Sequence, residues 1–135
     1  MNLVVVSNRV ARGKANELDR FWLRKTRKPV LAVLMVRRPD GALALHRGCN
    51  LEVSMPTGSL CAERNAIGTA LAADPSLARR DVVAVAVFAP DGPHPLDPCG
   101  ACNEWLAKIA EVSPAFRVLT FGDAQLESVF VRHTT

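Results

Sequence analysis

Apolar residues in this 135-residue chain gather in short runs that are separated by turn-forming residues. Runs that are continuous or rich in β-branched residues predict strands at 3–6, 30–36, 42–45, 82–88 and 115–121. Apolar or alanine-rich segments at helical spacing predict helices at 17–27, 61–73, 100–111 and 125–131. This order of elements is typical of an α/β domain with a mixed central sheet flanked by helices.

Three local patterns refine these assignments. Asp40-Gly41 between two apolar runs predicts a hairpin, because this pair tolerates a positive φ. The segment 17–27 is interpreted as an amphipathic helix that buries Phe21 or Trp22. The segment 125–131 carries Leu126, Val129 and Phe130 at helical spacing, so we expect a helix that faces the core, or secondarily a lid over a substrate.

Charge is distributed unevenly along the chain. Residues 1–50 contain eleven Lys or Arg against three Asp or Glu, a net charge of +8, whereas residues 51–135 carry −4. The densest cations are Arg24, Lys25, Arg27 and Lys28. This cluster is either the solvated end of a helix or a patch that attracts phosphates, in which case Phe21 and Trp22 could stack on bases.

Length and composition predict one domain covering residues 1–135, in which residues 1–28 form a divergent basic segment. No apolar run is long enough to span a membrane, and no secretory pattern is present. Free thiols persist best in a reducing compartment, so a cytoplasmic location is expected.

Two short motifs carry the candidate chemistry: Cys61-Ala62-Glu63, and Cys99 with Cys102 in the run PCGAC. Each motif opens a predicted helix, where the helix dipole and free N–H groups favour thiolates. Three protein ligands are what a catalytic zinc takes, which leaves a fourth position for water. Glu63 follows the first cysteine by two residues, within reach of that water, as in zinc-dependent base deaminases.

The cysteines allow two alternatives to a catalytic zinc site. A closed structural site would add Cys49 as a fourth ligand, but Cys49 lies at the end of a predicted strand, twelve residues before Cys61. A disulfide between Cys99 and Cys102 would leave Cys61 and Glu63 unexplained. Both alternatives therefore account for fewer residues than a catalytic site does.

The run CAER followed by PCGAC resembles the cytidine deaminases, and the three-cysteine set resembles their short, homotetrameric branch. The resemblance covers roughly residues 30–121 and implies a three-layer α-β-α fold with a central mixed five-stranded sheet. It also implies that Cys61, Cys99 and Cys102 hold Zn²⁺ and that Glu63 is catalytic.

The resemblance assigns further roles around these ligands. Asn50-Leu51-Glu52 stands eleven residues before Cys61, as the sugar-binding Asn-x-Glu does in the family. Asn50 and Glu52 are therefore expected to hold the sugar hydroxyls, and the backbone beside Ala62 to hold the base. Arg64 is expected to offset the charge of three thiolates on one Zn²⁺.

The chain also departs from the family pattern in its predicted substrate pocket. The strand at 30–34 lacks the family's Phe and Gly, Val53 replaces a second Asn, and Asn103-Glu104 replaces Arg-Gln. Zinc-dependent deamination of cytidine or deoxycytidine, a reaction of pyrimidine salvage, is the leading hypothesis, with a dimeric or tetrameric enzyme. The alternatives are a deaminase for cytosine in nucleotides or single-stranded nucleic acid, and a non-catalytic zinc-stabilised binding module.

Overall fold

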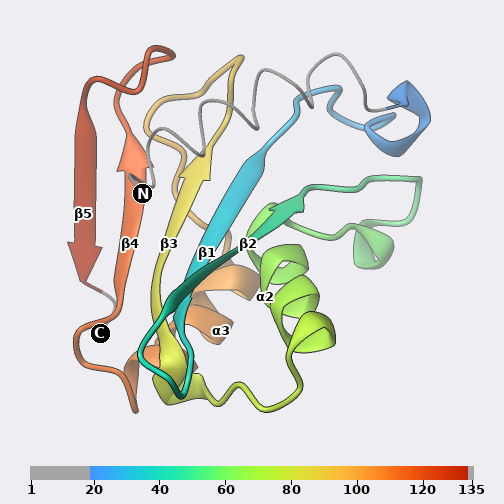
Figure 1. The fold of residues 1–135 in the computed structure, drawn as a ribbon. Helices are drawn as coiled ribbons and strands as arrows, with labels where there is room; N and C mark the ends of the chain where they lie inside the picture. Colours follow the sequence, from blue (N-terminus) through green and yellow to red (C-terminus); the bar gives the residue numbers. More distant parts are fainter. Residues whose placement is uncertain (1–18, 134–135) are drawn as a thin grey trace.

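The computed structural model describes residues 19–133, which form a single five-stranded sheet with helices packed against it (Figure 1). The strands are β1 (Leu31–Arg37), β2 (Leu43–Cys49), β3 (Val82–Phe88), β4 (Arg117–Phe121) and β5 (Val129–His133). The α-helices are α2 (Ala62–Ala73) and α3 (Gly100–Ala110), and the short 3-10 helices are η1 (Arg20–Trp22), η2 (Pro56–Gly58) and η3 (Arg79–Asp81). None of the described helices is long and apolar enough to cross a membrane.

The strands lie in the order β2-β1-β3-β4-β5. β1 pairs antiparallel with β2 and β3, β3 pairs parallel with β4, and β5 closes the sheet antiparallel to β4. The one parallel pair is joined through α3, since parallel neighbours need a long crossover connection. The predicted α/β fold with a mixed five-stranded sheet is therefore confirmed.

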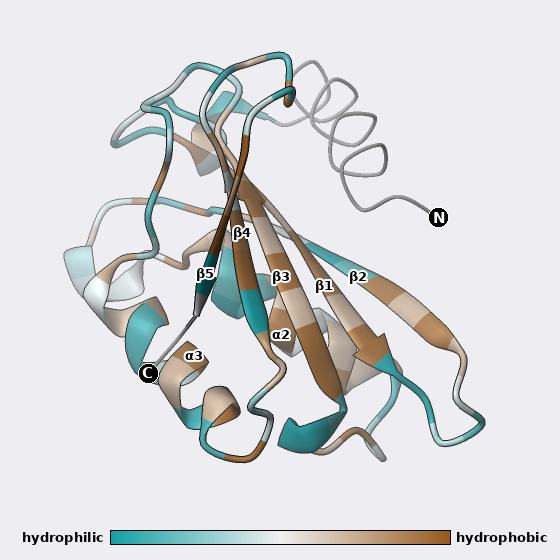
Figure 2. Cartoon of the chain, turned by 90° about the vertical axis from the view of Figure 1, so that its left-hand side faces the viewer, coloured by the Kyte–Doolittle hydropathy of each residue, from teal (hydrophilic) through white to brown (hydrophobic). Residues whose placement is uncertain are grey.

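Both faces of the central strands are buried. Ala32, Leu34 and Val36 of β1 face the core beneath α2 and α3, while Leu31 and Val33 face a second cluster on the other side. Figure 2 shows hydrophobic colour along the central strands and both α-helices on one side of the sheet. The described residues thus supply the sheet and one helical layer. The strand predicted at 3–6 lies outside them.

Most of the elements predicted between residues 30 and 121 are confirmed within a few residues. The Asp40-Gly41 hairpin joins β1 to β2, with Gly41 at a φ of +85° and the Arg38 N–H donating to the Ala42 carbonyl at 2.8 Å. β2 continues to Cys49, four residues beyond the strand predicted at 42–45. This extension matters because it carries the strand to the edge of the candidate site.

The helix predicted at 17–27 is wrong within the described residues. Only η1 is helical there, and the Asp19 carboxylate caps it by accepting the Phe21 N–H at 3.0 Å. Phe21 and Trp22 are 45% and 42% exposed, and Leu23 is buried instead. The reason is a bridge between Leu23 and Glu52, which holds this part of the chain against a distant segment.

The helix predicted at 125–131 is also wrong. The Asp123 carboxylate accepts the backbone N–H groups of Gln125, Glu127 and Ser128, each at 3.0 Å, and shapes a loop. Leu126 sits in this loop at a φ of +61° and buries its side chain. Residues 129–131 belong to β5 instead, because β4 offers an open edge for pairing.

Helix α2 approaches β2 closely at Gly48. A Cβ at this position would lie within 3 Å of backbone atoms of Ala62, Asn65 and Ala66, which belong to the first turns of α2. These obstructing atoms are backbone, so they cannot turn aside as the end of a side chain would. The absence of a side chain at Gly48 therefore sets the position of the helix that begins after Cys61.

We expect Gly48→Ala to destabilise the protein by about 3 kcal/mol, the upper part of the usual range for an overpacked core. Urea unfolding measures this loss. Gly68→Ala is the matched control, because a Cβ at Gly68 meets nothing within 4 Å and the residue is exposed on α2. That change should stabilise the helix by roughly 0.5–1 kcal/mol. Equal effects of the two substitutions would contradict the packing argument.

Candidate metal centre and active site

Three cysteines from two helix N-termini converge on one point. Cys61 is the N-cap of α2, Cys99 is the N-cap of α3, and Cys102 lies in the first turn of α3. Their three Sγ atoms all lie within 4.8 Å of one another, and those of Cys61 and Cys99 are 3.4 Å apart. The predicted placement of both motifs at helix N-termini is confirmed.

The donor set suits a metal ion. Three sulfur ligands are soft donors of the kind that zinc accepts, and three protein ligands are the number found in catalytic zinc sites. Cys49 is not part of the group; its carbonyl accepts a hydrogen bond from the Asn65 side chain at 2.9 Å. The structure therefore brings together the three-cysteine set rather than a closed set of four.

The environments of the three thiols differ. Burial raises the pKa of the Cys61 and Cys102 thiols above the ordinary value. Burial acts in the same direction on Cys99, but hydrogen bonds, first among them one from the Cys102 N–H, outweigh it and lower the Cys99 pKa. A cation held by the three thiols would favour the ionised form of Cys61 and Cys102, because a coordinating thiol loses its proton.

Glu63 lies in the first turn of α2 and is almost fully buried, with 4% of its surface exposed. Burial raises the pKa of its carboxyl above the usual value, and the favourable effects of the backbone, Cys102 and Arg64 only partly oppose this. A buried carboxyl beside a cluster of metal-ligating groups is typical of an acid–base residue. The structure thus places the buried carboxyl of Glu63 next to the cysteine cluster.

Arg64 brings a positive charge to the cysteines. Its Nη2 donates to the Cys61 Sγ at 3.6 Å, and its guanidinium lies 5.9 Å from the centre of the Trp105 ring. Hydrogen bonds to Cys61 and Cys102 raise the pKa of Arg64 further. This geometry fits the predicted role of balancing thiolate charge. Trp105 is a contact that the sequence patterns did not single out, although it stands one helical turn after Cys102.

Two backbone hydrogen bonds bring the segment that contains Asn50 and Glu52 close to Cys61. The Leu51 N–H donates to the Leu60 carbonyl and the Leu60 N–H donates to the Leu51 carbonyl, both at 2.9 Å. Leu60 directly precedes Cys61. The segment from Asn50 to Cys61, whose eleven-residue spacing was noted in the sequence, therefore forms a loop whose two ends are in contact.

The side chains of Asn50 and Glu52 also hold the segment that leads into β1. Asn50 accepts the Val30 N–H at 2.8 Å and donates to the Lys28 carbonyl at 3.0 Å. The Glu52 carboxylate accepts two hydrogen bonds from Thr26, one from the backbone N–H at 2.9 Å and one from the side-chain hydroxyl at 3.0 Å. Thr26 was not singled out from the sequence, because a contact across 26 residues leaves no local signal.

Asparagines support the backbone of both motifs. Asn65 reaches from α2 to β2, and the Asn103 side chain donates to the Pro98 carbonyl at 3.1 Å, which fixes the turn before α3. Ala62 opens α2, is completely buried and lies under Gly48. Its expected backbone contact with a base remains a prediction.

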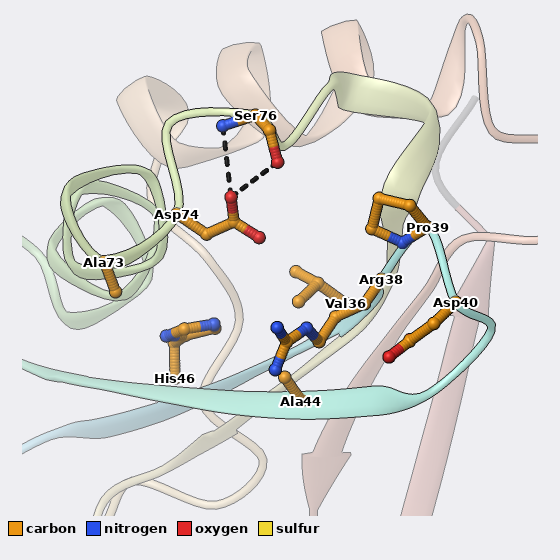
Figure 3. Close-up of a pocket in the computed structure, with 9 residues that line it drawn as sticks. All are labelled: Val36, Arg38, Pro39, Asp40, Ala44, His46, Ala73, Asp74 and Ser76. Carbon is orange, nitrogen blue, oxygen red and sulfur yellow. Dashed lines mark hydrogen bonds between the residues drawn. The ribbon is translucent and has the colours of Figure 1, made fainter.

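A separate pocket of about 580 Å³ lies at the far end of α2 (Figure 3). Arg38, His46 and Asp74 point into it, and Asp74 also accepts the Ser76 N–H at 3.1 Å. Twelve helical residues separate this pocket from Cys61, a length of about 18 Å at 1.5 Å per residue. The pocket contains none of the residues predicted for catalysis, so the cysteine cluster is the candidate active site.

Comparisons with known proteins agree with this geometry. The sequence matches the family model of the LmjF365940 subfamily CDD/CDA-like deaminase over residues 5–92 and 89–135. It is 39% identical over 100 residues to a cytidine deaminase of Halalkalibacterium halodurans, covering 74% of this chain and 67% of that protein. A cytidine deaminase of Sporosarcina psychrophila is 35% identical over 102 residues, covering 75% and 68% of the two chains.

Solved structures agree as well. The fold is similar to the crystal structure of cytidine deaminase from Burkholderia pseudomallei, with a TM-score of 0.74, 28% identity, and coverage of 99% of this chain and 94% of that one. The cytidine deaminase of Mycobacterium leprae matches with a TM-score of 0.62 and 26% identity over 97% and 94% of the two chains. The family model, the curated relatives and the similar crystal structure together show that the chain belongs to the cytidine deaminase family.

Proposed function

We propose that this protein catalyses the zinc-dependent hydrolytic deamination of cytidine and deoxycytidine to uridine and deoxyuridine, with release of ammonia. The observation that carries the proposal is the convergence of three cysteine thiols beside the buried carboxyl of Glu63. The names of the relatives support a cytidine-type substrate. Cys61, Cys99 and Cys102 would hold the zinc.

When bound, zinc supplies a water nucleophile at neutral pH, since it lowers the pKa of water from about 15.7 to about 7. Glu63 is the residue that moves protons in this proposal. Its carboxylate takes the first proton from the attacking water and delivers it to N3 of the base, then takes the second proton from the hydroxyl formed at C4 and delivers it to the leaving 4-amino group. One water and one cytidine thereby become one uridine and one ammonia. The burial of Glu63 keeps these transfers away from bulk solvent.

Asn50 and Glu52 are proposed to contact the sugar, and the backbone beside Ala62 to contact the base. A carboxylate offers about four acceptor sites. The Thr26 N–H, the Thr26 hydroxyl and the Asn50 amide already donate to Glu52, and the hydroxyl lies within hydrogen-bond distance of both carboxylate oxygens. A sugar hydroxyl bound by Glu52 would therefore take the place of the Thr26 hydroxyl.

A cytoplasmic homo-oligomer completes the proposal. The resemblance to the homotetrameric branch supports it, and so do exposed apolar side chains on the edge strand β5. These are Val129, Phe130 and Val131, which are 39%, 49% and 56% exposed.

The test is a substrate panel with the purified, zinc-loaded protein. We expect cytidine and deoxycytidine to be converted with stoichiometric ammonia release, and adenosine and guanosine to remain unchanged. Mass spectrometry of the base identifies the product, because the exchange of an amino group for oxygen changes the mass. Conversion of a purine nucleoside alone, or of none of the four, would contradict the proposed substrate.

A further inference from the structure

A basic and aromatic segment lies next to the candidate active site. Residues 20–28, here called the arm, carry five cations and no acidic residue, and the four cations between 24 and 28 are all exposed. Phe21 and Trp22 are 45% and 42% exposed, with their ring centres 5.1 Å apart and nearly perpendicular. Arg24 lies 5.3 Å from the centre of the Phe21 ring. Two aromatic faces and several cations are therefore available to a ligand at one place.

The arm is fixed to the wall of the site. The Glu52 N–H donates to the Trp22 carbonyl at 2.6 Å, the Glu52 carboxylate holds Thr26, and Leu23 is buried beneath. Glu52 is next to Leu51, which pairs with Leu60 immediately before Cys61. Two strand spacings of about 4.8 Å separate the backbone of Trp22 from that of Leu60, so Trp22 lies roughly 10 Å from the residue that precedes Cys61.

We propose that the arm binds single-stranded nucleic acid and presents a cytosine of that strand to the active site. This inference rests on the proposed deamination and adds a second substrate class to the free nucleoside. Single-strand binders combine cations that follow the phosphates with aromatic side chains on which bases stack. The arm has both, whereas residues 51–135 carry a net charge of −4.

The aromatic pair favours a strand over a mononucleotide. A mononucleotide places its one base beside Glu63, and its phosphate meets the cations, so Phe21 and Trp22 are left without a base. In a strand, the nucleotide next to the target cytosine supplies that base. The fixed backbone of the arm lowers the entropic cost of binding, since it is already ordered by Glu52.

The first test measures binding of a fluorescein-labelled, 12-nucleotide thymine strand to the zinc-loaded protein by anisotropy at several salt concentrations. This strand cannot be deaminated, so binding is read independently of catalysis. We expect a Kd that weakens as salt rises. The triple change Arg24→Gln, Lys25→Gln and Lys28→Gln should make the slope of log K against log [salt] shallower by about 2, at about 0.7 per lost phosphate contact.

The second variant tests stacking. Phe21→Leu with Trp22→Leu keeps apolar side chains but removes both aromatic faces, and it should weaken binding at least about 5-fold, the equivalent of losing one stacked base. The matched charge control is Arg37→Gln, Arg38→Gln and Arg80→Gln, exposed cations outside the arm. This control should bind the strand within about twofold of the wild type.

The outcomes separate the two proposals. Absence of strand binding, an equal loss in the charge control, or competition by cytidine monophosphate as effective as that by the strand would overturn the arm as a strand-binding surface. Turnover of cytidine in that case would leave the proposed function standing. Strand binding without conversion of either cytidine or a strand containing one cytosine would instead overturn deamination and keep the binding surface.

Discussion

Glu63→Gln is expected to remove turnover of cytidine while leaving the fold and the metal content unchanged. A general acid–base residue contributes about 10²–10⁴-fold, and a residue that serves several proton transfers should reach at least that range. Glutamine has the shape of glutamate, so the nearly complete burial of this side chain keeps its packing. The rate of ammonia release, with zinc measured on the same samples, checks the prediction.

Glu104→Gln is the matched control for this change. Glu104 is exposed on α3, two residues after Cys102, and removing its charge alters the net charge of the protein by the same amount. Its turnover should stay close to that of the wild type. If Glu63→Gln retains near-normal turnover, a different group moves the protons and the assignment of Glu63 fails.

Cys99→Ser is expected to empty the metal site. Loss of a direct ligand should weaken zinc binding by more than the roughly 10–100-fold caused by loss of an outer-shell partner. Metal analysis should fall from about one zinc per chain to a small fraction of that, with loss of turnover and a lower Tm. Cys99 is the best of the three cysteines to change, because it is exposed, whereas serine at the fully buried Cys102 would also bury a hydroxyl.

Cys49→Ser provides the control, since Cys49 is a free thiol outside the cluster. It should keep the zinc and the turnover of the wild type. A chelator should lower the Tm of the wild type and of Cys49→Ser, and leave that of Cys99→Ser unchanged. Wild-type zinc content in Cys99→Ser would show that the metal is held elsewhere.

The elements that sequence patterns predicted well are those whose signals are local. β3 at Val82–Phe88 is a continuous apolar run rich in valine, and α2 and α3 begin at the cysteine motifs that mark them. The grouping of Cys61, Cys99 and Cys102 followed from ligand spacing and from the resemblance. For these parts of the protein, residues within one helical turn or one strand are enough to predict the structure.

The failures share a different cause. Leu23 and Leu126 stand in segments whose apolar spacing imitates a helix, but each is held by contacts that the spacing cannot reveal. Leu23 is held by pairing with Glu52, and Leu126 by a loop that the Asp123 carboxylate organises. The close approach at Gly48 and the bond from Thr26 to Glu52 are likewise contacts between distant parts of the chain. Such packing is decided by the tertiary structure.

The two backbone hydrogen bonds between Leu51 and Leu60 close the loop formed by the residues between them. They hold Asn50 and Cys61, which lie just outside the loop, independently of the loop's own conformation. Residues 54–58 of that loop are exposed. The two ends of the loop are hydrogen-bonded to each other. Doubling the length of a flexible loop costs only about 0.6 kcal/mol in closure entropy. An insertion among residues 54–58 is therefore expected to leave Cys61 in place relative to Asn50.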